Sequence, residues 1–494
     1  MKLSFPFRIY LIALVLRLIP VLLTRSLGIG LDDMFQYDML ARSLAAGNGF
    51  RWYAQVDLKQ LEPYVDFDLA TAKGYDPKYG LYTSFRAPLY PAFLAIVYFF
   101  SGTGFTRFLA ARLAHVVLLG APLAPLTYFV SKYFSSSLFC DETKLEKVAK
   151  VSAWIVACYP MLLVYPLGLG TENPFFVLLL ASFLFLLKFI EQPTKLNLIL
   201  SGIFLALTAL TRSVILPFAG LAILYVIARR KQVSGKITPR NDVIWLGVAF
   251  VLVLAPWIVR NSLLHQKFTG IETSMGYNMY LGYYPQGNGS FIFGPSLDLL
   301  TIMDDAERDE VGTQKALGFI RAQPVRIVPL AINRLGFFFG LEKRVLMYFY
   351  SNDLLGYIPA RILFVVALAL LLPFVIISIS ALFGFSLLKW NPQTKLLGLL
   401  FFGYLLPHVF ILSEDRFHLA LIPYFSILAA LLWTGGFGGI LARWNDSLTG
   451  RVFVALAVVG AIFLFLNWGF ELSRDADKIA QLFGPNGNNS HFSY

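Results

Sequence analysis

Long apolar runs recur along almost the whole chain, from Leu11 to Phe470, and they constrain the fold more than any other feature. A helix that crosses a membrane needs about 20 apolar residues to span a hydrocarbon core of about 30 Å. No stretch of about 100 residues, the size of a small domain, lacks such a run. Only 14% of the residues are charged, against about a quarter in an average soluble protein. The sequence therefore predicts an all-α polytopic integral membrane protein.

About eleven segments qualify as membrane spans. They are residues 8–25, 107–133, 148–168, 173–190, 196–211, 213–229, 242–260, 358–388, 395–412, 418–441 and 451–470. Two further apolar runs, 88–100 and 325–341, are short or interrupted by arginine, and we expect them to lie at the membrane interface. Arg17 interrupts the first run and no small-residue cleavage site follows promptly, so we interpret this run as an uncleaved span.

Lysine and arginine in the short loops predict the orientation of the chain. The segment Arg229–Arg240 is the most basic loop, and four other basic loops fall on its side of the membrane if 88–100 does not cross. We therefore expect a multi-pass protein of the plasma membrane with a cytoplasmic N-terminus. This bias and anionic lipid headgroups explain most of the net charge of +12. Nucleic acid is not an expected partner, because the basic residues are not gathered on one soluble face.

Two large loops, 28–106 and 261–357, fall on the opposite, extracytoplasmic face and contain carboxylates, aromatic residues, glycine and proline. They divide the chain into an N-terminal transmembrane module (1–260) that includes the first loop, an outer loop with amphipathic helices (261–357), C-terminal spans (358–470) and a polar tail (471–494). Two folded loops on the outer face indicate chemistry or recognition there.

Charged residues at the outer ends of the spans are the strongest pointer to a site. Charges near a membrane core are costly, so they usually face a cavity, form pairs or take part in function. By the predicted topology, residues from distant parts of the chain share one level just outside the bilayer. They are Asp32, Asp33, Arg86, Glu172, Arg212, Arg260, Glu414, Asp415 and Arg416.

Each of these charges has a structural interpretation beside the functional one. Asp33 begins an amphipathic helix, because Tyr37 and Leu40 follow at helical spacing. Its carboxylate is either a helix cap or a general base that takes a proton from an acceptor hydroxyl. Arg86 is either a snorkelling side chain or a clamp on a phosphate. For Glu172, the structural alternative is an ion pair with one of the arginines.

Motifs for nucleotide or metal chemistry are absent from the sequence, which has no Walker loop, no dinucleotide fingerprint and no HExxH. Cys140 and Cys158 suggest neither a disulfide framework nor a metal site, and His408 and His418 are weak evidence for a metal. The sequence requires no cofactor and leaves a divalent metal open. If the site transfers a sugar, an enzyme that works on the outer face has little access to nucleotide sugars. A sugar donor linked to a membrane lipid therefore fits such a site better.

At these residues the sequence resembles the GT-C superfamily of membrane glycosyltransferases, above all the branch with protein O-mannosyltransferases (glycosyltransferase family 39) and the bacterial aminoarabinose transferase of lipid A. Asp33 and Tyr37 have the spacing of the family's D-E-x-x-Y motif, with Met34 in place of the second acid. The family's K-P-P-L-Y-P segment is matched by Arg86–Pro91, where Ala87 replaces a proline. Further matches in the same order are Thr171–Glu172, Gly202–Arg212, Pro256–Gly282 and Arg416–Leu419.

The resemblance implies a GT-C-like fold and a hexosyl- or pentosyltransferase. Such an enzyme moves a sugar, with inversion, from a polyprenyl-phosphate donor to a hydroxyl of a glycan, lipid or protein acceptor outside the membrane. It implies Asp33 as the catalytic base and arginines near the donor phosphate. The phosphate-binding residues would be Arg86, Arg212 and Arg260, supported by Asp32, Tyr37, Glu172 and Arg416.

Two other functions stay open. A transporter or flippase of lipid-linked sugars would carry charges deep in its spans and internal repeats, and neither is clear here. A non-catalytic membrane scaffold is the other alternative.

Overall fold

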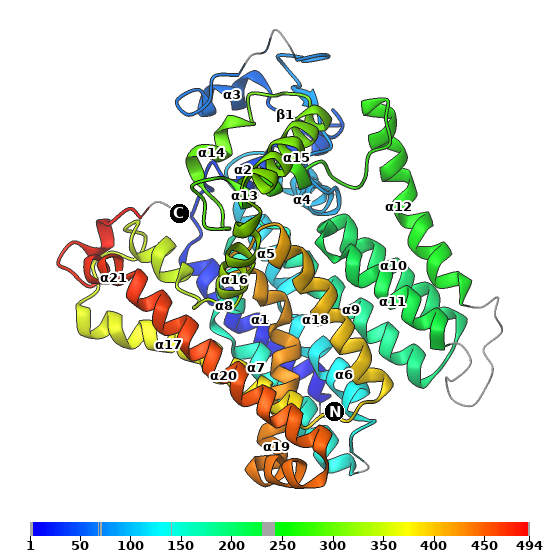
Figure 1. The fold of residues 1–494 in the computed structure, drawn as a ribbon. Coiled ribbons are helices and arrows are strands. Elements are labelled where there is room, and N and C mark those ends of the chain that lie inside the picture. The colour runs from blue at the N-terminus through cyan, green and yellow to red at the C-terminus, as the bar shows by residue number, and fades with distance from the viewer. Residues whose placement is uncertain (1–2, 68, 70–71, 140, 230–242, 493–494) are drawn as a thin grey trace.

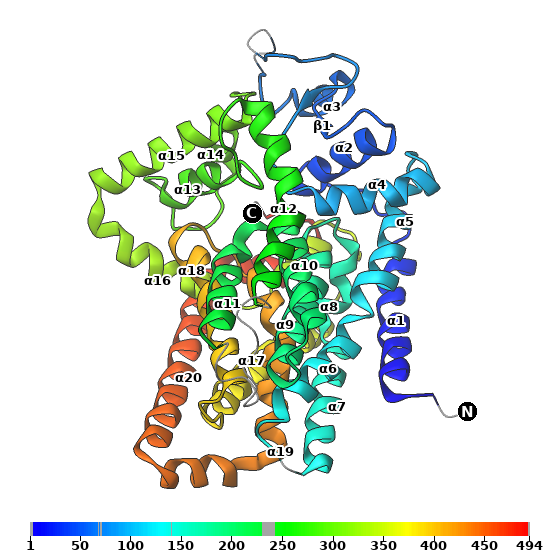
Figure 2. The same cartoon turned by 90° about the vertical axis from the view of Figure 1, so that its right-hand side faces the viewer.

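The computed structural model of the protein describes residues 3–67, 69, 72–139, 141–229 and 243–492. Helices form an upright bundle, and a layer of shorter helices covers one end of it (Figures 1 and 2). We call this the loop end. Within the described residues, the regular strands are β1 (Arg51–Trp52) and β2 (Leu81–Tyr82), which pair antiparallel. The prediction of an all-α polytopic membrane protein is confirmed.

The bundle consists of α1 (Phe5–Leu23), α5 (Arg107–Ala114), α6 (Leu123–Ser135), α7 (Glu142–Cys158), α8 (Pro160–Val164), α9 (Glu172–Glu191), α10 (Lys195–Thr211), α11 (Leu216–Arg229), α12 (Ile244–His265), α17 (Ala360–Ser386), α18 (Pro392–Phe410), α19 (Ile422–Asp446) and α20 (Leu448–Arg474). The shorter helices are α2 (Asp33–Ala45), α3 (Gln55–Leu61), α4 (Leu89–Ser101), α13 (Met275–Tyr283), α14 (Phe293–Asp298), α15 (Asp305–Ala322), α16 (Ile327–Phe338) and α21 (Ala476–Leu482).

The number of spans differs from the prediction. Among the described residues, seven helices are long and apolar enough to cross a membrane, or eight if the bent pair of α7 and Pro160–Leu167 counts as one span. The count of eleven is therefore not confirmed. The apolar helices Lys195–Thr211 and Ser213–Arg229 are shorter than the others. The helix α18 begins with polar residues and ends near Pro407 and His408, which lowers its hydropathy.

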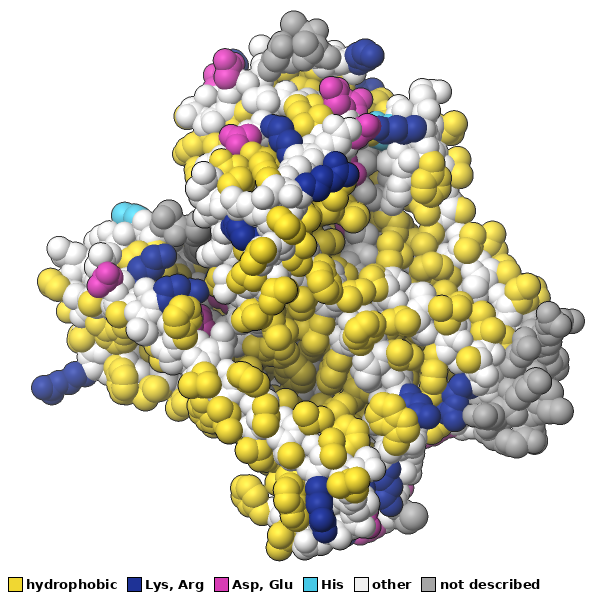
Figure 3. All heavy atoms as spheres, in the orientation of Figure 1, with side chains coloured by type: hydrophobic (Ala, Val, Ile, Leu, Met, Phe, Trp, Pro, Cys, Tyr) yellow, Lys and Arg dark blue, Asp and Glu magenta, His cyan; other side chains and the backbone are white. Residues whose placement is uncertain are grey.

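The sides of the bundle are apolar, as lipid contact requires. Leu252 on α12 is 66% exposed and Phe463 on α20 is 67% exposed, which water would penalise and lipid would not. Figure 3 shows the same pattern, with hydrophobic side chains across the middle of this face and charged ones at its top, at its left edge and toward its base.

The helix predicted over 148–168 is broken. Its two parts, α7 and Pro160–Leu167, are bent by 56°. Tyr159 is extended at the break, as a residue before proline tends to be. Arg17 donates hydrogen bonds to the carbonyl oxygens of Val156 (2.9 Å) and Ala157 (3.1 Å), which the break leaves without helical partners. The buried guanidinium of Arg17 in the first span thus satisfies carbonyl groups at the break after α7.

The two large loops form one layer at the loop end. In this layer α2 packs against α4, and α13 packs against α15. Asp305 from the second loop accepts a hydrogen bond from the backbone N–H of Ser84 in the first (2.8 Å). The hydroxyl of Ser84 lies 2.7 Å from Nε2 of His265 at the end of α12. These contacts fix the segment that carries Arg86.

The predicted basic loop and the predicted polar tail each include residues that the structure does not describe. Most of the basic loop Arg229–Arg240 lies outside the described residues. The predicted polar tail, 471–494, contains the end of α20 and the short α21, whose Leu482 is buried beside Leu346 and Tyr350.

Candidate active site

The start of α2 separates the two neighbouring aspartates. The carboxylate of Asp32 caps the helix, because it accepts the N–H of Met34 at 2.8 Å. Asp33 is the first helical residue, and its carboxylate pairs with the guanidinium of Arg86. Gln36, one turn along the same helix, accepts from Nε of Arg86 at 2.8 Å. The capping interpretation therefore holds for Asp32, while Asp33 faces an arginine.

Three more of the predicted residues join this pair. Arg416 lies 3.7 Å from a carboxylate oxygen of Asp33 and 3.8 Å from one of Glu172. Glu172, at the start of α9, pairs with Arg212 at the end of α10 at 2.6 Å. Asp33, Arg86, Glu172, Arg212 and Arg416 thus form one network, which we call the charged cluster. Its members come from five distant parts of the chain and lie at or near helix ends.

The charged cluster extends to carboxylates next to Arg416. Nε of Arg416 lies 2.9 Å from Glu414. Arg344 pairs with Glu414 at 3.0 Å and with Asp415 at 3.1 Å. Sequence reasoning missed Arg344, although the polar run of residues 342–344 directly after an apolar stretch was a signal for it.

Glu272 is a second residue that the sequence did not single out. Its carboxylate accepts the backbone N–H of Ser213 at 3.2 Å, directly after Arg212. The second outer loop therefore contacts the chain beside the cluster. Glu272 lies in a stretch without helical or strand periodicity, so no sequence signal marked it.

Two other predicted site residues, Tyr37 and Arg260, lie beside the charged cluster and are not members of it. The ring of Tyr37 is buried, 5.3 Å from the guanidinium carbon of Arg86, and packs edge-on against Tyr90. Arg260 instead donates to the backbone oxygen of Thr83 at 2.6 Å, and its guanidinium lies over the ring of Trp257. Arg260 thus supports the segment before Arg86 and is not part of the ion-pair network.

The surroundings shift the pKa values of Asp32 and Asp33 in opposite directions. Loss of solvent would raise the pKa of Asp33, but the cations Arg86 and Arg416 outweigh this, and the pKa lies below its usual value. Loss of solvent and the negative charge of Asp33 raise the pKa of Asp32. Burial raises the pKa of Tyr37 to about 12. The surroundings therefore favour the charged form of Asp33 and disfavour that of Asp32.

Exposure also distinguishes the acids. The side chain of Asp33 is 42% exposed, whereas that of Glu172 is 8% exposed. A ligand that approaches the charged cluster from the loop end can reach Asp33, and Glu172 lies behind it. Over the described residues, no group of three or more His, Cys, Asp and Glu side chains could hold a metal ion.

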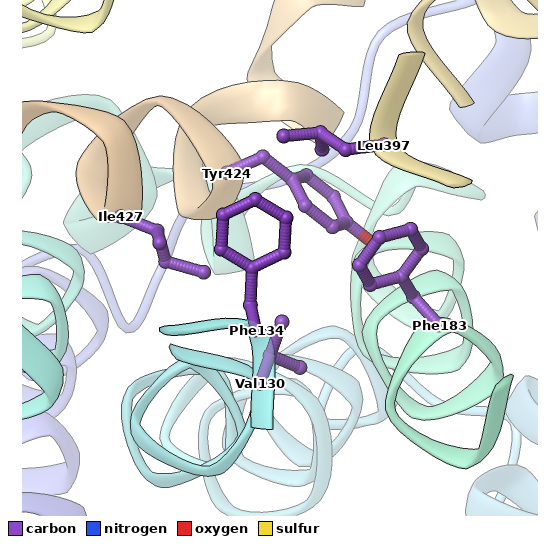
Figure 4. A pocket seen from close by; sticks show the side chains of 6 residues that line it. All are labelled: Val130, Phe134, Phe183, Leu397, Tyr424 and Ile427. Atoms are coloured by element: carbon purple, nitrogen blue, oxygen red, sulfur yellow. The ribbon is translucent and has the colours of Figure 1, made fainter. Parts of the chain in front are cut away.

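A small apolar pocket lies elsewhere in the bundle (Figure 4). It is lined by side chains of α6, α9, α18 and α19. Phe134, Phe183 and Tyr424 bring their rings together there, and no charged residue lines it. This pocket is a gap in the packing of the spans and does not belong to the charged cluster.

Part of the chain resembles a known protein family. Residues 141–259 match the sequence model of the dolichyl-phosphate-mannose-protein mannosyltransferase family. The predicted resemblance is confirmed. The matched segment includes Glu172 and Arg212, whereas Asp33, Arg86 and Arg416 lie outside it. This match supports a membrane glycosyltransferase. No curated protein matches the sequence.

Solved structures of two related kinds resemble the chain at low identity. ArnT from Cupriavidus metallidurans, bound to undecaprenyl phosphate, is 14% identical, with a TM-score of 0.38 over 89% of this chain and 79% of that one. The oligosaccharyltransferase AglB from Archaeoglobus fulgidus, in complex with an inhibitory peptide and a dolichol-phosphate, is 13% identical, with a TM-score of 0.41. That match covers 98% of this chain but only 61% of AglB.

Proposed function

We propose that the protein transfers a sugar from a polyprenyl-phosphate donor to a hydroxyl of an extracytoplasmic acceptor, with inversion at the anomeric carbon. The observation that carries the proposal is the position of Asp33. It is an accessible, ionised carboxylate between the guanidinium groups of Arg86 and Arg416. A sugar phosphate needs cations for its phosphate and a base for the incoming hydroxyl, and this arrangement offers both within one cluster.

The arginines are suited to the leaving group. A guanidinium presents a planar fork of donors that matches phosphate oxygens. Arg86 and Arg416 hold Asp33 directly, and Arg212 is linked to them through Glu172. We assign donor phosphate binding to Arg86, Arg212 and Arg416. Arg260 has a supporting place because it holds the backbone of Thr83.

The reaction follows from these roles. The hydroxyl oxygen of the acceptor forms a bond to the anomeric carbon while its proton passes to the carboxylate of Asp33. The bond between the anomeric carbon and the phosphate oxygen breaks, and polyprenyl phosphate leaves with the electron pair. The arginines stabilise the negative charge that grows on this oxygen. Attack opposite the leaving group inverts the anomeric centre.

The donor class has support from the matched family, whose description names dolichyl-phosphate-mannose, a sugar on a polyprenyl phosphate. The apolar sides of the bundle provide a surface for such a lipid tail. We infer that the cluster lies on the extracytoplasmic face of the plasma membrane, because the loop end lies opposite the last turns of α6 and the first turns of α7 (Figure 2). These turns carry Lys132, Lys144 and Lys147, which favour the cytoplasmic side.

The test is a donor screen with the purified full-length protein in detergent. Several radiolabelled polyprenyl-phosphate sugars are each incubated with a mixture of glycan, lipid and peptide acceptors. We expect at least one donor to release polyprenyl phosphate as its sugar appears on an acceptor. A transporter would move such lipids in vesicles and release no polyprenyl phosphate, and this result would contradict the proposal.

A further inference from the structure

Four consecutive residues at the loop end, Leu341–Arg344, are each fixed by polar contacts. The backbone N–H of Leu341 donates to Glu471 at 2.9 Å, and Lys343 pairs with the same carboxylate at 2.7 Å. Arg344 pairs with the carboxylates beside Arg416. The segment therefore links the end of α20 with the charged cluster.

Glu342 makes the least exposed of these contacts. Its side chain is 1% exposed and accepts a hydrogen bond from the hydroxyl of Tyr159 at 2.6 Å. The same oxygen lies 2.9 Å from Nε2 of His418, whose side chain is fully buried. Nδ1 of His418 donates to the carbonyl oxygen of Phe338 at 2.7 Å. Three separate elements thus meet at one carboxylate.

The contact between Glu342 and His418 holds a proton. A carbonyl can only accept, so Nδ1 of His418 carries a hydrogen, and Nε2 faces the carboxylate. One proton is shared between Nε2 of His418 and the carboxylate of Glu342. If Nε2 carries it, the imidazolium donates to the carboxylate, and if Glu342 carries it, the carboxylic acid donates to Nε2. Burial raises the pKa of Glu342, while His418 and Tyr159 oppose this effect. A buried charged pair is weak evidence for added stability, and in some proteins such a pair instead fixes one arrangement of the chain.

We propose that Glu342 and His418 are a positioning pair for Arg344 and Arg416. Glu342 lies two residues before Arg344, and His418 lies two residues after Arg416. The pair therefore joins the two segments that carry these arginines, and the arginines meet again at Glu414, at 3.0 and 2.9 Å. Holding both segments at two points sets the direction in which Arg416 faces Asp33.

This inference rests on the proposed function, because it assumes that Arg416 binds the donor phosphate. A merely structural contact would change stability alone. A positioning pair would also change phosphate binding, and its effect would depend on the presence of Arg416. A double-mutant cycle separates these two roles.

The experiment measures binding of a short-chain polyprenyl phosphate to the full-length protein in detergent. The variants are His418→Gln, Arg416→Gln, their combination and Glu342→Gln. We expect His418→Gln and Glu342→Gln to weaken binding roughly fivefold or more, the size of effect that couples residues in one network. We expect the double variant to bind no more weakly than Arg416→Gln alone.

The matched control is Glu146→Gln at the other end of α7 from Tyr159. Glu146 also accepts a tyrosine hydroxyl, that of Tyr128, at 2.9 Å. Its substitution should leave phosphate binding unchanged. Melting temperatures show whether each variant folds, and if His418→Gln does not, Glu342→Gln and the milder Tyr159→Phe carry the test.

The possible failures can be told apart. If the wild-type protein does not bind polyprenyl phosphate, the proposed function fails and this inference fails with it. If the wild-type protein binds but the effects of His418→Gln and Arg416→Gln multiply independently, only the positioning role is overturned. Unchanged binding in both His418→Gln and Glu342→Gln would also overturn only the positioning role.

Discussion

Asp33 meets two opposing demands. A general base must be ionised, yet a carboxylate that cations stabilise strongly is a weak proton acceptor. In the structure, Arg86 and Arg416 keep Asp33 ionised. A donor phosphate that binds these guanidinium groups would share their charge and make Asp33 more basic. Donor binding would thus prepare the base for the incoming hydroxyl.

A pH profile tests this account of Asp33. Because its pKa is lowered, the carboxylate stays ionised below its usual value of 3.8, and the acid limb of kcat/KM should lie below that pH. Arg86→Gln removes a cation, so the pKa should rise and the limb should move to higher pH, with lower activity throughout. The stability from this pairing is likewise present above 3.8 and lost as the pH falls through the lower pKa of the folded state.

The control for this profile is Arg51→Gln. Arg51 lies over the ring of Tyr82 in the same outer loop and is outside the charged cluster. Its substitution should leave the limb in place. A limb that does not move in Arg86→Gln would mean that another group controls the acid side.

Much of the residue-scale picture was predictable, since charges that are costly near lipid had to converge or pair. Asp33, Arg86, Glu172 and Arg416 were expected at one level and do meet. Arg344 was missed, because the polar run of residues 342–344 marks a loop but does not show whether its arginine reaches a site or faces water. The three-dimensional pairing of Glu342 with His418 is also invisible to any local pattern.

At the scale of elements, the break between α7 and α8 has a cost that Arg17 offsets. Carbonyl groups left without partners in an apolar region are unfavourable, and the guanidinium satisfies two of them. Hydropathy predicted a continuous span here because it does not register a bend. Pro160, with the extended residue before it, was the sequence feature that marked the break.

Removing this support should destabilise the fold. Arg17→Met leaves two buried carbonyls without a donor, at about 1–3 kcal/mol each in the free energy of unfolding. Arg8→Met, in the exposed part of the same helix α1, should cost less than about 0.5 kcal/mol. Thermal unfolding in detergent measures both. Equal stability of the two variants would show that the break needs no capping.

Close helix packing gives a second prediction at this scale. A Cβ atom at Gly384 of α17 would lie 1.9 Å from the backbone oxygen of Leu428 in α19. Gly384→Ala should therefore push these helices apart and cost about 1–3 kcal/mol. Gly220→Ala on α11, where a Cβ meets nothing within 4 Å, is the control and should be neutral or slightly stabilising. Thermal unfolding in detergent measures both variants, and equal stability of the two would contradict a close contact between α17 and α19 at Gly384.

At the scale of the whole molecule, the loops and the charged cluster share one end of the bundle. The orientation of this end in the membrane stays a prediction from the lysine-rich connections. Hydropathy predicted that the chain is polytopic, but its count of eleven spans is not confirmed, because some apolar helices of the described residues, such as the 17-residue α10, are shorter than the rest.

Cysteine labelling tests the orientation. In a variant without Cys140 and Cys158, single cysteines replace Lys73 at the loop end and Lys144 at the start of α7. A membrane-impermeant thiol reagent applied to intact cells should label Lys73→Cys and not Lys144→Cys. Labelling of both positions, or the reverse pattern, would place the cluster on the wrong side for the proposed reaction.

The most direct measurement is the ratio of polyprenyl phosphate released to sugar transferred, in wild-type protein and in Asp33→Asn. We predict one lipid phosphate per transferred sugar in the wild-type enzyme and a loss of at least about 100-fold in both products in Asp33→Asn, the size of a lost general base. Asp76→Asn, which can keep the turn contacts that Asp76 makes to the N–H groups of Lys78 and Tyr79, should transfer normally. Full turnover in folded Asp33→Asn would contradict the account.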